Sequence, residues 1–312
     1  MSEKRALGKT DLYVNPVGYG ANSVGGHNLF HNLSEEMGKS VVRTAIEHGV
    51  NFIDTAFSYG KGRSEELIGE VIAELGVRHD IVLATKGAHR YVGEQRIIDN
   101  SPDFLREQVE NSLRRLKTDY IDLYYIHYPD EATPKYEAVG VLKELKDEGK
   151  IRAIGLSNFS LDQIKEANQD GYVDVVQDEY NLLNRSAENE FLPYLQEQGI
   201  AFVSYYPLAS GILAGKYTKD MTFDDLRARL PYFQGENYVK NLEKVEKIKE
   251  IAADKNVEVA QVVLAWYLTR DDITAIIPGA KRPEQVLTNI QALDVRLSDE
   301  EIRLIDEIFP VE

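Results

Sequence analysis

Short apolar runs alternate with longer amphipathic segments along the whole chain. The apolar runs predict buried β-strands, and the amphipathic segments between them predict helices. Several amphipathic segments end at a glycine followed by an apolar residue, which indicates a helix end because that position often takes the left-handed conformation. We therefore expect helix ends at Gly49, Gly76, Gly149, Gly171 and Gly199. The expected strands are 16–20, 52–56, 81–86, 121–127, 153–158, 175–180, 201–207 and 274–280.

Polar residues of the kind that cap helix N-termini predict where the helices begin. Ser34 precedes an amphipathic segment, and Ser101 and Thr133 each stand directly before a proline. Ser160 and Ser298 are each followed three residues later by a glutamine or glutamate, which is the capping-box pattern. Helices are expected to start after all these residues.

Strands alternating with helices suit either a (β/α)8 TIM barrel or a doubly wound sheet. Polar candidate residues follow nearly every strand, and barrels build their active sites at that end, so the α/β class with a (β/α)8 barrel is favoured. A dinucleotide-binding doubly wound sheet also needs a glycine fingerprint directly before a helix, and segment 18–23 has only two of the three glycines. Segment 5–17 is expected to form an N-terminal β-hairpin at the bottom of the barrel.

Composition narrows the class of protein. No linker-like stretch interrupts the 312 residues, so we expect a single domain over residues 1–312. The net charge of −16 argues against nucleic acid or an anionic membrane as partner, and zero cysteines exclude disulfides and thiolate metal sites. His27 and His31 are four apart, but their surroundings do not predict a helix, and we expect no metal site. With no signal core or membrane-length apolar run, we expect a cytoplasmic monomer or weak oligomer.

Four chemically complementary residues follow consecutive strands: Asp54, Tyr59, Lys86 and His127. Reduction of a carbonyl needs a proton donor for the oxygen on which negative charge develops. A tyrosine stays protonated at neutral pH, and a nearby lysine is expected to lower the pKa of the phenol. Asp54 would supply the counter-ion for a buried Lys86, and His127 would orient the carbonyl oxygen.

Each of these residues also has a plain structural alternative. The chain has 18 tyrosines, so Tyr59 alone suits packing, while Asp54 suits a turn and His127 a core imidazole. Lys86 is the hardest to explain structurally, since it ends an apolar strand and lysine is rarely buried unpaired. The combination on successive strand ends favours a proton-donating site.

Polar groups after later strands suit a dinucleotide. Ser157, Asn158 and Gln177 can pair with a carboxamide, although the first two also suit helix capping. The small-residue stretch 208–216, which ends at Lys216, suits a phosphate, although it also suits a plain flexible loop, and the irregular segment 218–237 suits a lid. Lys281 and Arg282 stand together before a predicted helix, where an adenosine 2′-phosphate would bind, and this favours NADPH over NADH.

Asp54, Tyr59, Lys86 and His127 match the catalytic tetrad of the aldo-keto reductases in order and spacing, and the chain resembles that superfamily from end to end. The resemblance implies Tyr59 as general acid, tuned by Lys86 and Asp54, with His127 positioning the substrate. Histidine rather than glutamate at the last position implies carbonyl reduction. The sequence segments 24–27, 62–69, 181–185 and 278–282 look closest to those of bacterial aldo-keto reductases linked to inositol utilisation and general stress.

The resemblance also implies two sets of ligand contacts. The implied cofactor contacts are Gly20, Asn22, Asp54, Ser157, Asn158, Gln177, Tyr205, Pro207, Leu208, Ser210, Gly211, Lys216, Gly279, Lys281, Arg282, Gln285 and Asn289, with Tyr205 stacking on the nicotinamide. The implied substrate pocket is Asn22, Phe57, His89, Tyr128 and Tyr206. Asn22 and Tyr128 stand where many members carry tryptophan, and Gly279 and Gln285 where many carry lysine and arginine. The chain ends soon after a predicted helix, without the long C-terminal loop of the mammalian reductases, which implies loose specificity.

These features predict an NADPH-dependent oxidoreductase that reduces small-molecule aldehydes or ketones to alcohols. The main alternative is a nicotinamide-binding redox sensor or regulatory protein with little turnover. Potassium-channel β subunits use this fold in that way. A glycosidase ranks lower, because it needs paired carboxylates and Asp54 is the only convincing acid at a strand end; Glu179 lies within an expected strand.

Overall fold

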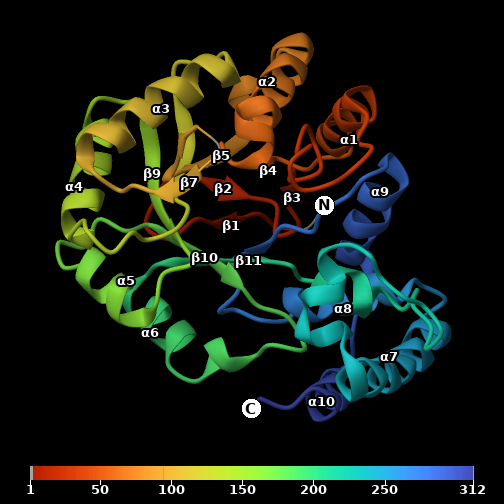
Figure 1. Ribbon diagram of the computed structural model, residues 1–312. Helices are drawn as coiled ribbons and strands as arrows, with labels where there is room; N and C mark the ends of the chain where they lie inside the picture. The colour runs from red at the N-terminus through yellow and green to blue at the C-terminus, as the bar shows by residue number, and fades with distance from the viewer. Residues whose placement is uncertain (1–2, 94, 312) are drawn as a thin grey trace.

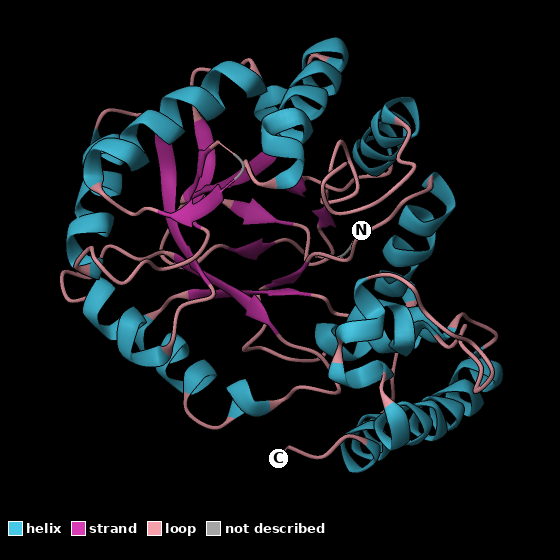
Figure 2. Cartoon of the chain, viewed as in Figure 1, coloured by secondary structure: helices cyan, strands magenta, loops and turns pink. Residues whose placement is uncertain are grey.

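A ring of parallel strands forms the centre of the protein (Figures 1 and 2). The structure is a computed structural model that describes residues 3–93 and 95–311. The eight strands pair in the order β3, β4, β5, β8, β9, β10, β11, β12. Their bounds are β3 Tyr19–Gly20, β4 Phe52–Asp54, β5 Val82–Gly87, β8 Ile121–Ile126, β9 Ile151–Ser157, β10 Val175–Glu179, β11 Ala201–Tyr205 and β12 Ala275–Ile276. Parallel bridges Val17↔Ile276 and Gly20↔Gly279 join the two outer strands, so the expected (β/α)8 barrel is confirmed.

Helices surround the strand ring on its outside (Figure 1). Their bounds are α1 Glu35–Glu47, α2 Arg63–Leu75, α3 Pro102–Leu116, α4 Lys135–Asp147, α5 Leu161–Ala167, α6 Phe191–Gln198, α7 Gly235–Lys255, α8 Val259–Leu268, α9 Pro283–Gln291 and α10 Asp299–Ile308. Apolar residues of the helices pack on the outward side chains of the strands. No helix within the described ranges is both long and apolar enough to cross a membrane.

The N-terminal hairpin closes the bottom of the barrel, as its sequence predicts. Strands β1 (Arg5–Ala6) and β2 (Tyr13–Val14) pair antiparallel. Leu7, Leu12 and Val14 are buried in the same apolar cluster as the inward-facing side chains of the barrel strands. The hairpin therefore supplies the floor of the barrel interior, opposite the end at which the strands deliver their polar residues.

The helix starts are confirmed in part. Ser34, Ser160 and Ser298 accept backbone N–H groups as N-caps, the last two within capping boxes. Ser101 is the N-cap of α3, but its hydroxyl donates to Asp99 at 2.6 Å and makes no capping bond. The expected start after Thr133 is wrong by one residue, because this hydroxyl bonds Asp130 and the next residue, a proline, is the N-cap of α4.

The helix ends follow the glycines with one exception. Gly76 and Gly199 are left-handed C-caps of α2 and α6, with φ of 67° and 64°. Gly49 and Gly149 are also left-handed, each following the C-cap residue of its helix. Gly171 is different, because α5 already ends at Ala167 and a turn intervenes.

A second hairpin, which the sequence pattern did not predict, follows strand β5. Strands β6 (His89–Val92) and β7 (Gln95–Ile98) pair antiparallel between β5 and α3. They leave the barrel at the carboxyl end of β5, where the candidate site lies. Polar residues make up half of these two short strands, and most of their side chains are partly or fully exposed, so they lack the continuous apolar run by which the barrel strands are recognised.

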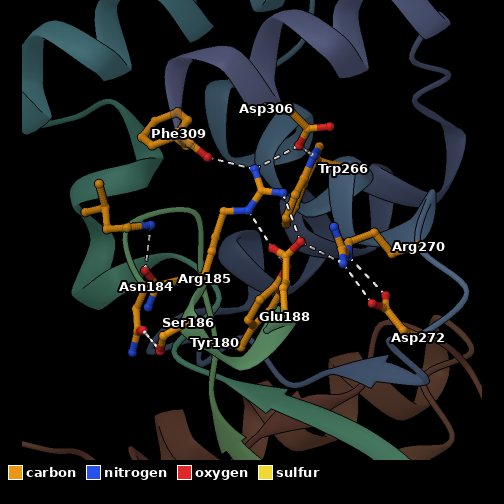
Figure 3. A network of polar contacts seen from close by, with 12 residues as sticks. Tyr180, Asn184, Arg185, Ser186, Glu188, Trp266, Arg270, Asp272, Asp306 and Phe309 are labelled. Atoms are coloured by element: carbon orange, nitrogen blue, oxygen red, sulfur yellow. Dashed lines mark hydrogen bonds and ion pairs between the residues drawn. The ribbon is translucent and has the colours of Figure 1, made fainter. Parts of the chain in front are cut away.

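A buried arginine attaches the C-terminal helix to the barrel (Figure 3). Arg185 follows β10 and pairs with Glu188 at 2.5 Å and with Asp306 of α10 at 2.9 Å. It also donates to the carbonyl of Phe309 at 2.7 Å, and the Trp266 indole of α8 donates to Asp306 at 3.1 Å. These contacts fix α10 against the loop after β10 and against α8.

Candidate active site

The four expected catalytic residues meet at the carboxyl end of three neighbouring strands. Asp54 is the last residue of β4, Lys86 lies near the end of β5, and His127 directly follows β8. Tyr59 opens the short helix η1 (Tyr59–Gly62) after β4. Because β4, β5 and β8 are adjacent in the barrel, side chains from distant parts of the chain lie side by side.

Lys86 and Asp54 form a buried ion pair. The Lys86 and Asp54 side chains are almost inaccessible, at 1% and 2% exposure, and Lys86 Nζ bonds Asp54 Oδ1 directly. Lys86 also donates to the carbonyl of Thr55 at 2.9 Å, and the Gln177 amide donates to the other oxygen of Asp54 at 2.9 Å. Burial lowers the pKa of Lys86 and raises that of Asp54, while the attraction between them opposes both shifts.

Tyr59 lies next to this ion pair. Lys86 Nζ is 5.8 Å from the centroid of the Tyr59 ring, and the His127 ring is 6.2 Å away and nearly perpendicular to it. Burial raises the pKa of Tyr59 well above its usual range, and the charge of Asp54 raises it further. The expected net lowering of this pKa by Lys86 does not appear, because burial and the charge of Asp54 dominate. The phenol stays protonated and can donate.

The two histidines of the site are uncharged. Burial lowers the pKa of His127 well below its usual range and that of His89 to about 4, and nearby cations add to both shifts. The His127 ring lies 4.9 Å from His89 and is stacked 4.9 Å from Tyr128, and its Nδ1 is 3.4 Å from the hydroxyl of Ser58. No cluster of metal-ligating side chains occurs among residues 3–93 and 95–311.

Asn28 holds the backbone on both sides of Tyr59, a role that no sequence pattern indicated. Its amide nitrogen donates to the carbonyl of Ser58 at 3.0 Å, and its amide oxygen accepts the N–H of Gly60 at 2.6 Å. Gly60 is left-handed at φ 65°, and a Cβ there would lie 2.0 Å from the carbonyl oxygen of Gly25. The turn that carries Tyr59 is thereby fixed by a loop from a different part of the chain.

The expected nicotinamide partners lie together beside the tetrad. Asn158 is left-handed at φ 62°, and its amide nitrogen donates to the His127 carbonyl at 2.9 Å and to Ser157 Oγ at 3.0 Å. Its amide oxygen accepts the Tyr205 hydroxyl at 2.7 Å. Ser157 is 1% exposed, and within the described residues no hydrogen bond uses its hydroxyl as the donor. A buried donor facing neighbouring amide groups fits a carboxamide ligand.

The loop after β11 is a tight turn with unusual backbone angles. Pro207 and Leu208 lead into η4 (Ala209–Ala214), where Ala209, Ser210 and Gly211 are all left-handed, with φ of 45°, 56° and 89°. Ala209 and Gly211 donate their backbone N–H groups to the carbonyls of Tyr206 and Leu208 inside this turn, each at 2.8 Å. The phosphate contacts that the resemblance implies here stay a prediction.

Three cations gather where the phosphates are expected. The pKa of Lys281 is lowered by burial first and then by the charges of Arg227 and Lys216, which shows that the three lie close together. Arg227 lies in η5 (Leu226–Arg229) of the irregular segment, donates to the Tyr217 hydroxyl at 2.9 Å, and was not expected from the sequence. Asp225 partly neutralises the group through its ion pair with Arg227.

The remaining expected contacts lie around the same end of the barrel. Gln285 accepts the backbone N–H of Lys281 at 2.8 Å, and Arg282 is the N-cap residue of α9. Gly20 forms a β-bridge with Gly279, and the Asn22 side chain approaches the same glycine. The last member of the set, Asn289, is buried on α9.

Most of the expected substrate residues lie around Tyr59, whereas Asn22 lies beside Gly279. The aromatic residues Tyr128, Tyr205 and Tyr206 lie close enough that their charges would raise the pKa of Tyr59. Tyr128 and Tyr206 are about 40% exposed, so they line an opening to solvent. On the other side, the Phe57 ring packs edge-on against Tyr91 of the β6–β7 hairpin, at 6.0 Å.

Known proteins resemble the whole chain. The model of the aldo/keto reductase family matches residues 16–309. The chain is 37% identical over 320 residues to the NADH-specific methylglyoxal reductase of Escherichia coli (strain K12), covering 98% of each chain. It is 37% identical over 301 residues to an aldo-keto reductase of Schizosaccharomyces pombe whose name specifies NADP(+), covering 94% of this chain and 88% of that one. The solved structure of a glycerol dehydrogenase from Gluconobacter oxydans matches with a TM-score of 0.91 at 33% identity, covering 98% and 94% of the two chains.

Proposed function

Because the chain belongs to the aldo/keto reductase family, an oxidoreductase family that uses a nicotinamide cofactor, we propose that it is an NADPH-dependent enzyme that reduces small aldehydes or ketones to alcohols. The observation that carries this proposal is the buried Lys86–Asp54 pair beside a protonated Tyr59. Burying an ion pair is unfavourable unless both charges are well satisfied, and a purely structural pair would not need a phenol and a neutral imidazole beside it.

The proposed proton transfer starts from Tyr59. When bound, the reduced nicotinamide supplies a hydride to the carbonyl carbon. The carbonyl oxygen takes up the electron pair of its π bond and receives the proton of the Tyr59 hydroxyl, which completes the alcohol. Lys86 stabilises the resulting phenolate until solvent reprotonates it. His127 is neutral with Nδ1 towards Ser58, which leaves Nε2 to position the carbonyl oxygen.

The same proposal assigns the cofactor contacts. The carboxamide would be held by Ser157, Asn158 and Gln177. Tyr205 would break its hydrogen bond to Asn158, and its ring would then stack on the nicotinamide. The left-handed turn 209–211 would hold the pyrophosphate. The cation cluster at Lys281 supports a 2′-phosphate and hence NADPH, although one relative at the same identity is named NADH-specific.

Tyr59→Phe tests the assignment of the acid. We expect oxidation of NADPH in the presence of a panel of small aldehydes, ketones and sugar-derived carbonyls to slow by about 100-fold or more, with NADPH affinity unchanged, because only the transferable proton is lost. Equal rates in both proteins would remove Tyr59 from this role. Tight NADPH binding without turnover on any carbonyl would favour the redox sensor instead.

Lys281→Ala/Arg282→Ala tests the cofactor preference. Each contact of a charged side chain with a phosphate contributes about 1.5 to 3 kcal/mol, so NADPH affinity should fall by roughly 10-fold or more. NADH has no 2′-phosphate and serves as the matched control, since its affinity should change little. An equal loss of affinity for both cofactors would show that the two cations do not read the 2′-phosphate.

A further inference from the structure

One face of the β6–β7 hairpin lies against the substrate opening. His89 pairs with Ile98 and Tyr91 with Arg96, and in an antiparallel ladder these alternate pairs share one face. Two members of this face contact the site directly. The His89 ring is 4.9 Å from that of His127, and the Tyr91 ring is 6.0 Å from that of Phe57. Arg96 therefore lies on the side of the hairpin that faces the site.

The opposite face of the hairpin is turned towards α3. Arg90 lies on that face, paired in register with Ile97. It forms an ion pair with Asp99 at 2.8 Å and lies 5.4 Å from the ring centroid of Phe104. One arginine of the hairpin is thus neutralised away from the site, while the other projects towards it.

Arg96 and Lys61 bring positive charge to the opening. Lys61 follows Tyr59 by two residues, and its Nζ lies 4.6 Å from the centroid of the Tyr91 ring. Tyr91 is the cross-strand partner of Arg96 in the hairpin. No carboxylate in residues 3–93 or 95–311 forms an ion pair with either cation. The charge of Arg96 also helps to lower the pKa of both His89 and His127, in keeping with the face of the hairpin on which it lies.

The far side of the opening carries negative charge. Asp178 and Glu179 end strand β10, next to the tyrosines that follow β8 and β11. Burial raises the pKa of Asp178 to about 6, and Glu179 accepts the hydroxyl of Tyr232 at 2.6 Å. The opening is therefore polarised, with cations on the hairpin side and carboxylates on the β10 side. An anionic ligand entering it is directed towards the hairpin.

We propose that the enzyme selects carbonyl substrates that carry an anionic group, a carboxylate or a phosphate, bound by Arg96 with Lys61 while the carbonyl lies at Tyr59 and His127. This inference rests on the proposed carbonyl reduction. The planar guanidinium of Arg96 suits both kinds of anion, since each offers two oxygens to a pair of N–H donors. The ammonium of Lys61 adds charge without fixing direction.

Matched substrate pairs test the inference. We would measure kcat and KM for 4-oxobutanoate against its methyl ester, and for glyceraldehyde 3-phosphate against glyceraldehyde, in the wild type, Arg96→Gln and Arg90→Gln. In the wild type, kcat/KM should favour the charged member by about 10-fold or more, mostly through KM, because the contact is remote from the reacting bond. Arg96→Gln should remove most of this preference, and Arg90→Gln, on the opposite face of the same hairpin, should keep it.

The outcomes separate the two proposals. Turnover of the neutral aldehydes without any preference for the charged partners, or a preference that survives in Arg96→Gln, would overturn this inference and leave the proposed function intact. Failure to reduce any of the four compounds would overturn the proposed function and the inference with it. A preference in only one pair identifies carboxylate or phosphate as the anion. Salt should weaken a genuine preference, because the pair of charges is partly exposed.

Discussion

Lys86→Met removes the partner of a carboxylate that is almost fully buried. Among residues 3–93 and 95–311, the Gln177 amide is then the one remaining hydrogen-bond donor to the Asp54 side chain. Leaving one member of a buried ion pair charged and alone destabilises a protein by about 3 to 5 kcal/mol. The alternative is that Asp54 takes up a proton, which at pH 7 costs about 4 kcal/mol, since its pKa in the unfolded chain is about 3.9 and each pH unit corresponds to about 1.36 kcal/mol. We therefore expect the free energy of unfolding to fall by about 4 kcal/mol at pH 7.

The pH dependence identifies the cause. Burial raises the pKa of Asp54 above its value in the unfolded chain. The loss of unfolding free energy in the variant is therefore present at a pH above the unfolded pKa, and it shrinks as the pH falls towards that pKa. At pH 5 the loss should be only about 1.5 kcal/mol. Urea unfolding followed by circular dichroism at both pH values measures it, and Lys86→Met/Asp54→Asn should recover much of the loss at pH 7. An equal loss at pH 5 and pH 7 would refute the electrostatic reasoning and indicate lost packing instead.

Three further predictions concern the turn at the acid, the imidazoles and the packing of two helices. Asn28→Ala frees the backbone around Tyr59, so kcat should fall about 10-fold with little change in KM. Asn28→Asp keeps one of the two hydrogen bonds and should recover part of the lost kcat, whereas equal kcat in the wild type and both variants would contradict the positioning role. Because burial keeps His127 and His89 neutral, kcat/KM for a neutral aldehyde should stay constant from about pH 8 to about pH 6. An inflection near the ordinary histidine pKa of about 6.5 would contradict this expectation. Gly69→Ala places a Cβ 2.7 Å from backbone atoms at the end of α3, so thermal unfolding should show a loss of about 1 to 3 kcal/mol, and an unchanged midpoint would show that α2 and α3 separate freely.

The barrel was predictable because its strands are buried on both faces. Such strands are continuous apolar runs, and the amphipathic helices between them leave few other architectures. The outer strands are shorter than expected, at two residues each for β3 and β12. Pro16 and Pro278 lie in the expected runs and have no backbone N–H for a ladder, which limits pairing at these positions.

The site was predictable only where chemistry coincides with a strand end. Asp54 and Lys86 stand at the ends of apolar runs, so the alternation of elements places them together. Asn28 and Arg96 act through tertiary contacts made by an irregular loop and a short, partly exposed hairpin, and no local periodicity marks such positions. The pKa of Tyr59 depends first on its burial and then on the charge of Asp54, and both are properties of the packed site.

The closure of the barrel has a consequence for biosynthesis. Gly20 bridges to Gly279, and Arg5 donates to the carbonyls of Leu268, Arg270 and Ile273, so the first strand is completed by residues near the end of the chain. At about 5 to 20 residues per second, a ribosome needs roughly 13 to 50 s to synthesise the interval between those two glycines. During that time the nascent sheet has an open parallel edge on β3 and an exposed apolar interior. Holdase chaperones should therefore bind nascent chains that stop before β12, and release them once that strand has emerged.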